Sequence, residues 1–174
     1  LLPQPGLSLG QVSVESTMFP ALSAKTLSVA PSLTGLMTFK PGVSIYAEKL
    51  LGGDLSLSTR GGDKNTAGHL KQKLNLDLSD ISLGEITKLT QLPINLSGSA
   101  TGNVEAQVDP EFSDQPQGQI DLKVERVSLN ESNFTSPMMG PMSLPKINIQ
   151  NLVLQAKMDK GVLDITKLTV GVPN

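Results

Sequence analysis

Residues able to do nucleophilic or acid–base chemistry are few in this chain. His69 is the only histidine among 174 residues, and cysteine is absent. A Ser-His-Asp or Cys-His arrangement would therefore depend on this one side chain as its base. His69 ends the Gly-rich, polar stretch from Arg60 to His69, which is typical of a loop. We interpret His69 as a solvated loop residue and expect a protein that is not an enzyme.

Two groups of carboxylates are the remaining candidates for acid–base or metal chemistry. They are Asp77, Asp80 and Glu85, and then Asp109, Glu111 and Asp114. The second group lacks the acidic spacing and the central glycine of an EF-hand loop, and one histidine without cysteine builds no zinc or iron–sulfur site. Nothing in either segment gives a reason for a perturbed pKa. We interpret both groups as solubilising charges and expect no catalytic residue, metal or cofactor.

The strongest pattern lies between these groups, from Ile94 to Val108, where every even position is apolar or small and every odd position is polar. A period of two predicts a β-strand with one dry and one wet face. At ~3.3 Å per residue the strand would run roughly 50 Å, two to three times a common strand. Such a strand favours a broad sheet used as a surface over a compact catalytic pocket.

Small residues in the middle of this dry face have two interpretations. Gly98, Ala100 and Gly102 would leave room for a bulky group, so the face could form an apolar groove for an acyl chain or a partner strand. Alternatively, an opposing Leu or Met fills the space, or glycine permits a bend. The residues of the candidate groove are Ile94, Leu96, Gly98, Ala100, Gly102, Val104, Ile120, Leu122, Val124, Leu152 and Leu154.

The elements around this strand predict an all-β protein. Alternating apolar residues recur in about nine or ten segments, separated by turn signals, and several segments shift by one residue, as at Gly10-Gln11, which is typical of a β-bulge. Near 83–91 the spacing changes to three, after the capping-box pattern Ser82 to Glu85, which predicts one short helix. The segments 109–117 and 130–145 are predicted loops. We expect a long, twisted, mostly antiparallel meander sheet curled into a half-pipe or an open sandwich.

Composition excludes several classes of protein. The net charge is -2, and lysine and arginine are scattered, which argues against nucleic-acid binding. No apolar run approaches the ~20 residues of a transmembrane helix. Aromatic residues are only 3% of the chain, which disfavours an outer-membrane barrel with its aromatic girdles.

Three segments together resemble the type II secretion system protein N family, within the broader AsmA-like envelope proteins. They are the strand and "P-S-L" stretch of Pro20 to Leu33, the strand, Gly-Gly turn and returning strand of Val43 to Leu55, and the "Gly-x-Leu-x-Ile-x-x-Leu" unit within Lys160 to Leu168. The resemblance covers most of the chain and implies a periplasmic location. It also implies that residues 1–174 are a single β domain of a longer protein, anchored in the inner membrane by an N-terminal helix outside this sequence. No catalytic residue comes with the family.

The sequence leaves three functional hypotheses. The first is a non-enzymatic structural or assembly component of a bacterial type II secretion system, whose partners are other envelope proteins of that system and are bound through sheet edges or the apolar face. The second is an AsmA-like lipid-binding or lipid-bridging groove that takes acyl chains. The third is an extracellular carbohydrate-binding or adhesive β-sandwich, which the scarcity of aromatics disfavours.

Overall fold

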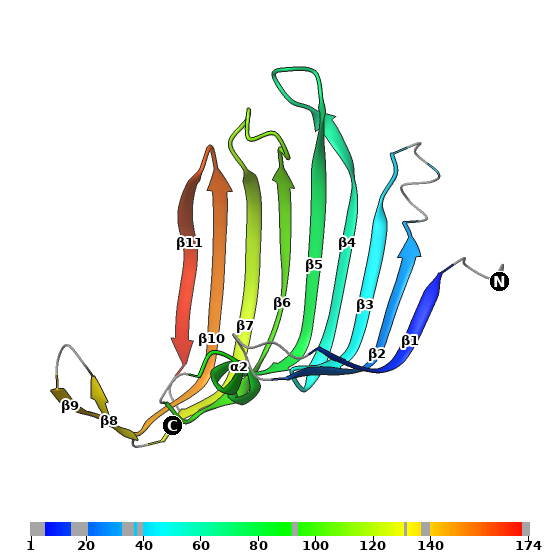
Figure 1. Ribbon diagram of the computed structural model, residues 1–174. Coiled ribbons are helices and arrows are strands. Elements are labelled where there is room, and N and C mark those ends of the chain that lie inside the picture. Colours follow the sequence, from blue (N-terminus) through cyan, green and yellow to red (C-terminus); the bar gives the residue numbers. More distant parts are fainter. Residues whose placement is uncertain are drawn as a thin grey trace.

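The described residues form an antiparallel sheet of nine strands, the short helix α2 and a small two-stranded hairpin. The computed structural model describes residues 6–14, 21–32, 37, 40–91, 94–130, 132–136 and 140–171. Figure 1 shows the strands side by side, from β1 at one edge to β11 at the other. They are β1 (Leu7–Val14), β2 (Leu22–Pro31), β3 (Val43–Leu50), β4 (Gly53–Lys64), β5 (Leu70–Ser82), β6 (Leu96–Val108), β7 (Gln117–Leu129), β10 (Ile147–Asp159) and β11 (Val162–Gly171). The predicted all-β meander is confirmed.

Strands adjacent in the sheet are also adjacent in the chain, apart from one insertion. The hairpin of β8 (Ser132–Ser136) and β9 (Gly140–Leu144) lies between β7 and β10 and forms its own two-stranded sheet. Every strand of the large sheet pairs antiparallel with the large-sheet strands that precede and follow it in the chain, and the two longest connections contain α2, between β5 and β6, and the hairpin, between β7 and β10.

The pairing register separates apolar from polar side chains across the whole sheet. In the middle of the sheet, Leu76 opposes Val104, which opposes Ile120, while the adjacent Asp77 opposes Asn103, which opposes Asp121. Successive side chains of a strand point to opposite faces, so one face is aliphatic and the other carries hydroxyl, amide and charged groups.

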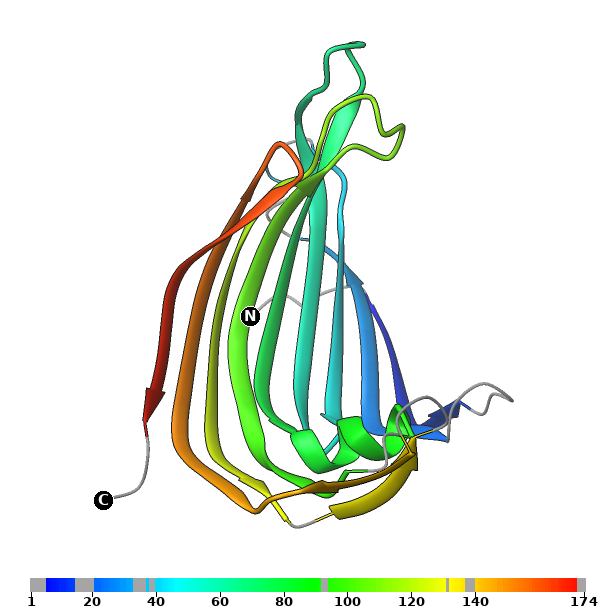
Figure 2. The same cartoon turned by 90° about the vertical axis from the view of Figure 1, so that its left-hand side faces the viewer.

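A line of irregular positions crosses the sheet and bends it. Gln11, Asp80 and Arg126 have φ values of 52°, 54° and 53° within their strands, and the apolar alternation shifts by one residue at each. The register also shifts where β5 pairs with β6 and where β6 pairs with β7. Bulges of this kind increase the twist and bend the strands. Figure 2 shows the result, a half-pipe in which the lower ends of the strands curve beneath the helix.

The helix α2 (Leu83–Leu89) lies on the inner, concave side of this bend (Figure 2). Its N-cap is Ser82, whose Oγ accepts a hydrogen bond from the Glu85 backbone N–H at 3.3 Å. Ile81, Ala100 and Val124 oppose one another on β5, β6 and β7 and are at most 7% exposed. This buried row lies beside α2, so the concave face is the apolar one.

The structure differs from the sequence predictions at element boundaries. The central strand begins at Leu96, so Ile94 and Asn95 precede it, and the helix ends at Leu89, with Thr90 and Gln91 in a turn. The predicted loop 60–69 is right for 65–69 and wrong for 60–64, because β4 continues to Lys64 and pairs with β5 across Gly61. The predicted loop 130–145 is also wrong, since it contains the hairpin β8–β9.

Candidate functional site

The concave face carries two rows of apolar residues that cross all nine strands without a polar interruption. Each row follows residues that oppose one another from strand to strand. The first row is Leu7, Val29, Ile45, Leu57, Leu76, Val104, Ile120, Ala156 and Ile165. The second is Leu9, Leu27, Ala47, Leu55, Leu78, Gly102, Leu122, Leu154 and Leu168. With strands ~4.8 Å apart, each row extends over roughly 38 Å. We call this surface the concave apolar face.

Among the described residues, no second layer of strands or helices covers most of the concave apolar face. Only six apolar residues in the described part of the chain are buried, and none of the larger side chains there is less than 2% exposed. The total accessible surface is 11,698 Å², whereas a compact protein of 18.4 kDa would expose about 8,200 Å². An apolar surface of this extent is typical of a site for an apolar ligand or partner.

The structure places most of the predicted groove residues on this face. Gly102, Leu122 and Leu154 are neighbours in the second row, and Val104 and Ile120 are neighbours in the first. A third, shorter row contains Ala100, Val124 and Leu152. Leu96 opposes Leu129 nearer the bend, Gly98 lies within the bulge itself, and Ile94 lies outside the strand.

The small residues do not leave an open slot. A Cβ added to Gly102 would lie 2.4 Å from the Asp121 carbonyl oxygen and 3.0 Å from the Leu122 Cδ1. A Cβ added to Gly98 would lie 3.2 Å from the Leu83 Cδ1, and the φ of Gly98 is 136°. Gly102 therefore allows close packing against β7, and Gly98 allows the bend. This agrees with the second interpretation of the small residues, in which neighbouring side chains fill the space or glycine permits a bend.

Several residues of the concave apolar face were not identified from the sequence as groove residues. They include Leu57, Leu76 and Leu78 in the centre of the sheet. The alternation within each of these strands is visible in the sequence, but the strand order that brings the segments side by side is not.

A second cluster joins the loops at the opposite end of the sheet from α2. Asp109 is 4% exposed and accepts hydrogen bonds from the Asn65 amide at 3.0 Å and from the backbone N–H groups of Glu111, Ser113 and Asp114 at 2.9–3.1 Å. Burial works to raise the pKa of the Asp109 carboxyl, but these hydrogen bonds hold it below its ordinary value of 3.8. The interpretation of Asp109 as a solubilising charge is therefore wrong, because this carboxylate orders a loop.

The same cluster contains the Lys71–Asp114 ion pair and a contact between His69 and Glu111. Lys71 Nζ lies 2.6 Å from Asp114 Oδ2, and the Thr66 hydroxyl donates to Asp114 Oδ1 at 2.8 Å. The Lys71 ammonium is the main cause that lowers the pKa of Asp114. His69 contacts Glu111 through Nδ1 and has an exposed side chain. We call the contacts of Asp109 and Asp114 the loop clasp. They give these two carboxylates a structural role.

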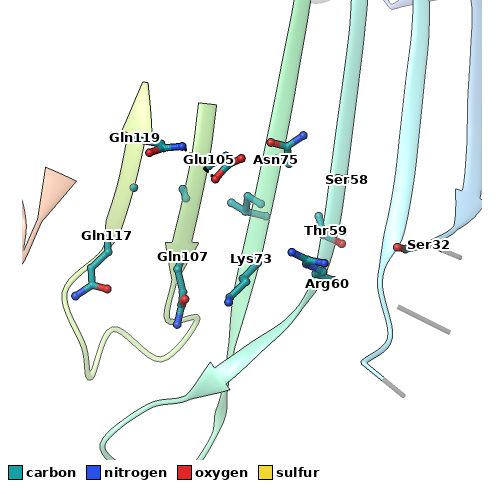
Figure 3. Close-up of a pocket in the computed structure, with 13 residues that line it drawn as sticks. Ser32, Ser58, Thr59, Arg60, Lys73, Asn75, Glu105, Gln107, Gln117 and Gln119 are labelled. Carbon is teal, nitrogen blue, oxygen red and sulfur yellow. Dashed lines mark hydrogen bonds between the residues drawn. The ribbon is translucent and has the colours of Figure 1, made fainter. Parts of the chain in front are cut away.

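The convex, polar face has a hollow of about 580 Å³ over β4 to β7 and another of about 460 Å³ over β5, β6, β7 and β10. Figure 3 shows that the labelled side chains of the larger hollow are amides, hydroxyls and charged groups, which come from the neighbouring strands β4 to β7 except for Ser32, next to the end of β2. Arg60 and Lys73 oppose each other there, and Lys73 lies 3.5 Å from Asp63. This lining suits water and polar molecules and offers no apolar surface comparable to the concave side.

The described residues contain no group of three or more histidine, cysteine or acidic residues that could hold a metal ion. Across the same ranges, no helix is both long and apolar enough to span a membrane. Comparison with protein-family models, curated proteins and solved structures gave no match.

Proposed function

We propose that this protein is a non-enzymatic binding module whose concave apolar face holds the acyl chains of lipids. The observation that carries the proposal is the pair of uninterrupted apolar rows across nine strands. A flexible hydrocarbon chain of a lipid matches a long, aliphatic surface that has no polar group at which a ligand could be oriented. We place this function in the periplasm of a bacterium, in a protein anchored to the inner membrane, as the resemblance implies.

The chemistry of the lining favours acyl chains over other apolar ligands. The two rows consist of Leu, Val, Ile, Ala and Gly. Tyr46 lies on the polar face, opposite Ser28, and its hydroxyl donates to Asp54 at 3.1 Å. A sugar site usually contains aromatic platforms, and no aromatic residue occurs in either apolar row, so the carbohydrate-binding alternative receives no support.

The test compares two charges placed on opposite faces of one strand. Ile120 is half-buried in the first apolar row, and Gln119 is exposed on the polar face. A carboxylate cannot be covered by an acyl chain without a large desolvation cost, so Ile120→Glu should weaken binding of a fluorescent fatty acid by at least about tenfold. Gln119→Glu adds the same charge and should bind as the wild type does.

Native mass spectrometry of the protein isolated from a bacterial envelope gives an independent measure. The wild type and Gln119→Glu should carry phospholipid, and Ile120→Glu should not. Equal lipid on all three proteins, with unchanged circular dichroism, would show that lipid does not occupy this face.

A structural role in a type II secretion system is the second candidate, and the open edges of the sheet favour it. β1 and β11 each pair on one side only among the described strands. Unpaired strand edges can bind an extended segment of another chain by β-augmentation. The partners would be other envelope proteins of the secretion system.

Site-specific crosslinking tests this second candidate. A photo-crosslinking residue at Thr169, in the edge strand β11, should capture a secretion-system protein in envelope extracts, whereas the same residue at Asn103, in the central strand β6, should not. Crosslinking from both positions, or only to lipid, would contradict binding through this edge.

A further inference from the structure

The edge strand β1 has neither the charges nor the proline that commonly keep a sheet edge from pairing. Its eight residues, Leu7–Val14, contain no Lys, Arg, Asp, Glu or Pro. Leu7, Leu9 and Val14 are 62%, 46% and 49% exposed. Natural edge strands are commonly protected by charge or proline, and the other edge, β11, carries Asp164 and Lys167. Of the two edges of the described sheet, β1 is therefore the one without charge or proline to oppose pairing with another strand.

The sequence of β1 is nearly symmetric about its centre. Read antiparallel to itself about the midpoint of Gly10 and Gln11, Leu7 opposes Val14, Ser8 opposes Ser13 and Leu9 opposes Val12. The shift of alternation at Gln11, whose φ is 52°, keeps all four apolar residues on the concave face in this register. A twofold interface requires such self-complementarity, because the same surface serves both copies.

The topology also favours this pairing over a head-to-tail arrangement. The large sheet has nine strands that alternate in direction, so β1 and β11 run the same way. With the concave faces of both copies on the same side, joining β11 of one copy to β1 of the next would make a parallel pair, which is slightly less stable per residue than an antiparallel one. It would also leave edges free for open-ended growth.

The geometry points to a twofold dimer in which β1 of one copy pairs antiparallel with β1 of a second copy. The twofold axis is perpendicular to the sheet, so the concave apolar faces of both copies lie on the same side. The two nine-stranded sheets then form one continuous sheet, and the apolar rows run from one copy into the other. This inference concerns the edge and does not depend on lipid binding.

Two charge-matched variants test both the edge and its register. Ser8 and Ser13 lie on the polar side of β1, opposite Ser28 and Ser23 of β2, so substitutions there leave the concave face unchanged. In the dimer, position 8 of each copy opposes position 13 of the other, so the twofold axis produces this pair twice. S8K/S13K therefore creates two lysine–lysine pairs, whereas S8E/S13K creates two glutamate–lysine pairs. Two like-charge cross-strand pairs should weaken dimerisation by about tenfold, and the opposite-charge variant should dimerise at least as well as the wild type.

The measurement is sedimentation velocity of the delipidated protein at several concentrations, with Thr169→Lys on β11 as the control for the other edge. We expect dimers for the wild type, S8E/S13K and Thr169→Lys, and mostly monomer for S8K/S13K. Three results would overturn the inference: a wild type that stays monomeric at the highest concentration, equal dimerisation of the two double variants, or dissociation by Thr169→Lys alone. Circular dichroism confirms that each variant is folded.

Discussion

At the residue scale, Asp109 holds two loops in place, although the sequence around it gives no sign of this role. Its carboxylate accepts four hydrogen bonds within the loop clasp, and its pKa is lowered in the folded protein. A carboxyl group with a lowered folded pKa stabilises the fold above its unfolded pKa, and that contribution is lost as the pH falls through the folded value.

We therefore predict that the loop clasp opens in acid before the sheet unfolds. Protection of the amides over 65–69 and 109–116, taken as the intrinsic exchange rate at each pH divided by the observed rate, should be high at neutral pH and fall below about pH 4, near the ordinary carboxyl pKa. Asp109→Asn should show low protection in these loops already at neutral pH, while protection in the central strands stays high. Protection in the loops that does not change with pH would contradict the role of this carboxylate.

A second prediction at this scale concerns the glycine in the middle of the long strand. Gly102→Ala puts a Cβ 2.4 Å from the Asp121 carbonyl oxygen, so the pairing of β6 with β7 must shift. We expect the free energy of unfolding to fall by about 1–3 kcal/mol, measured by urea denaturation. Gly10→Ala is the matched control, because a Cβ there meets nothing within 4 Å, and a comparable loss at Gly10 would rule out the steric explanation.

At the scale of elements, α2 is the only part of the described chain that covers the concave apolar face. Its first turn depends on the Ser82 hydroxyl, which accepts from the Glu85 N–H. Ser82→Ala should lower the free energy of unfolding by about 1 kcal/mol and accelerate hydrogen exchange in 83–89. Ser79→Ala, an exposed serine three residues earlier on the same strand, should change neither quantity, and equal effects of both substitutions would contradict the capping role.

The elements also show what could be predicted from sequence. The alternation from Leu96 to Val108 identified the central strand, and the capping-box pattern at Ser82 located the helix, because both signals are local in the chain. The hairpin β8–β9 was missed because the segment 130–145 has no clear alternation. The burial of Asp109 was also missed, since its main side-chain donor is Asn65, 44 residues away, and no local pattern reveals a contact at that distance. The concave apolar face itself depends on register between strands, so only its part on β6, β7 and β10 was predicted.

At the scale of the whole molecule, the open half-pipe makes stability depend on what covers its concave side. An apolar face without a second layer gives the folded state less buried surface than a compact protein of this size has. A ligand that binds only the folded state raises the free energy of unfolding by RT ln(1 + [L]/Kd), which is about 2.7 kcal/mol at a ligand concentration of a hundred times Kd. For a chain of this length, that corresponds to about 5–10 °C in Tm.

We predict this rise in Tm for a long-chain fatty acid kept below its critical micelle concentration. The wild type and Gln119→Glu should show the full shift in calorimetry, and Ile120→Glu should show little, because its carboxylate lies in the first apolar row. The same fatty acid should displace a hydrophobic dye from the native wild type, since both would compete for the concave apolar face. A Tm that does not rise with fatty acid, in a protein that binds the dye, would mean that the face is covered by a protein partner, which is the outcome that the secretion-system alternative requires.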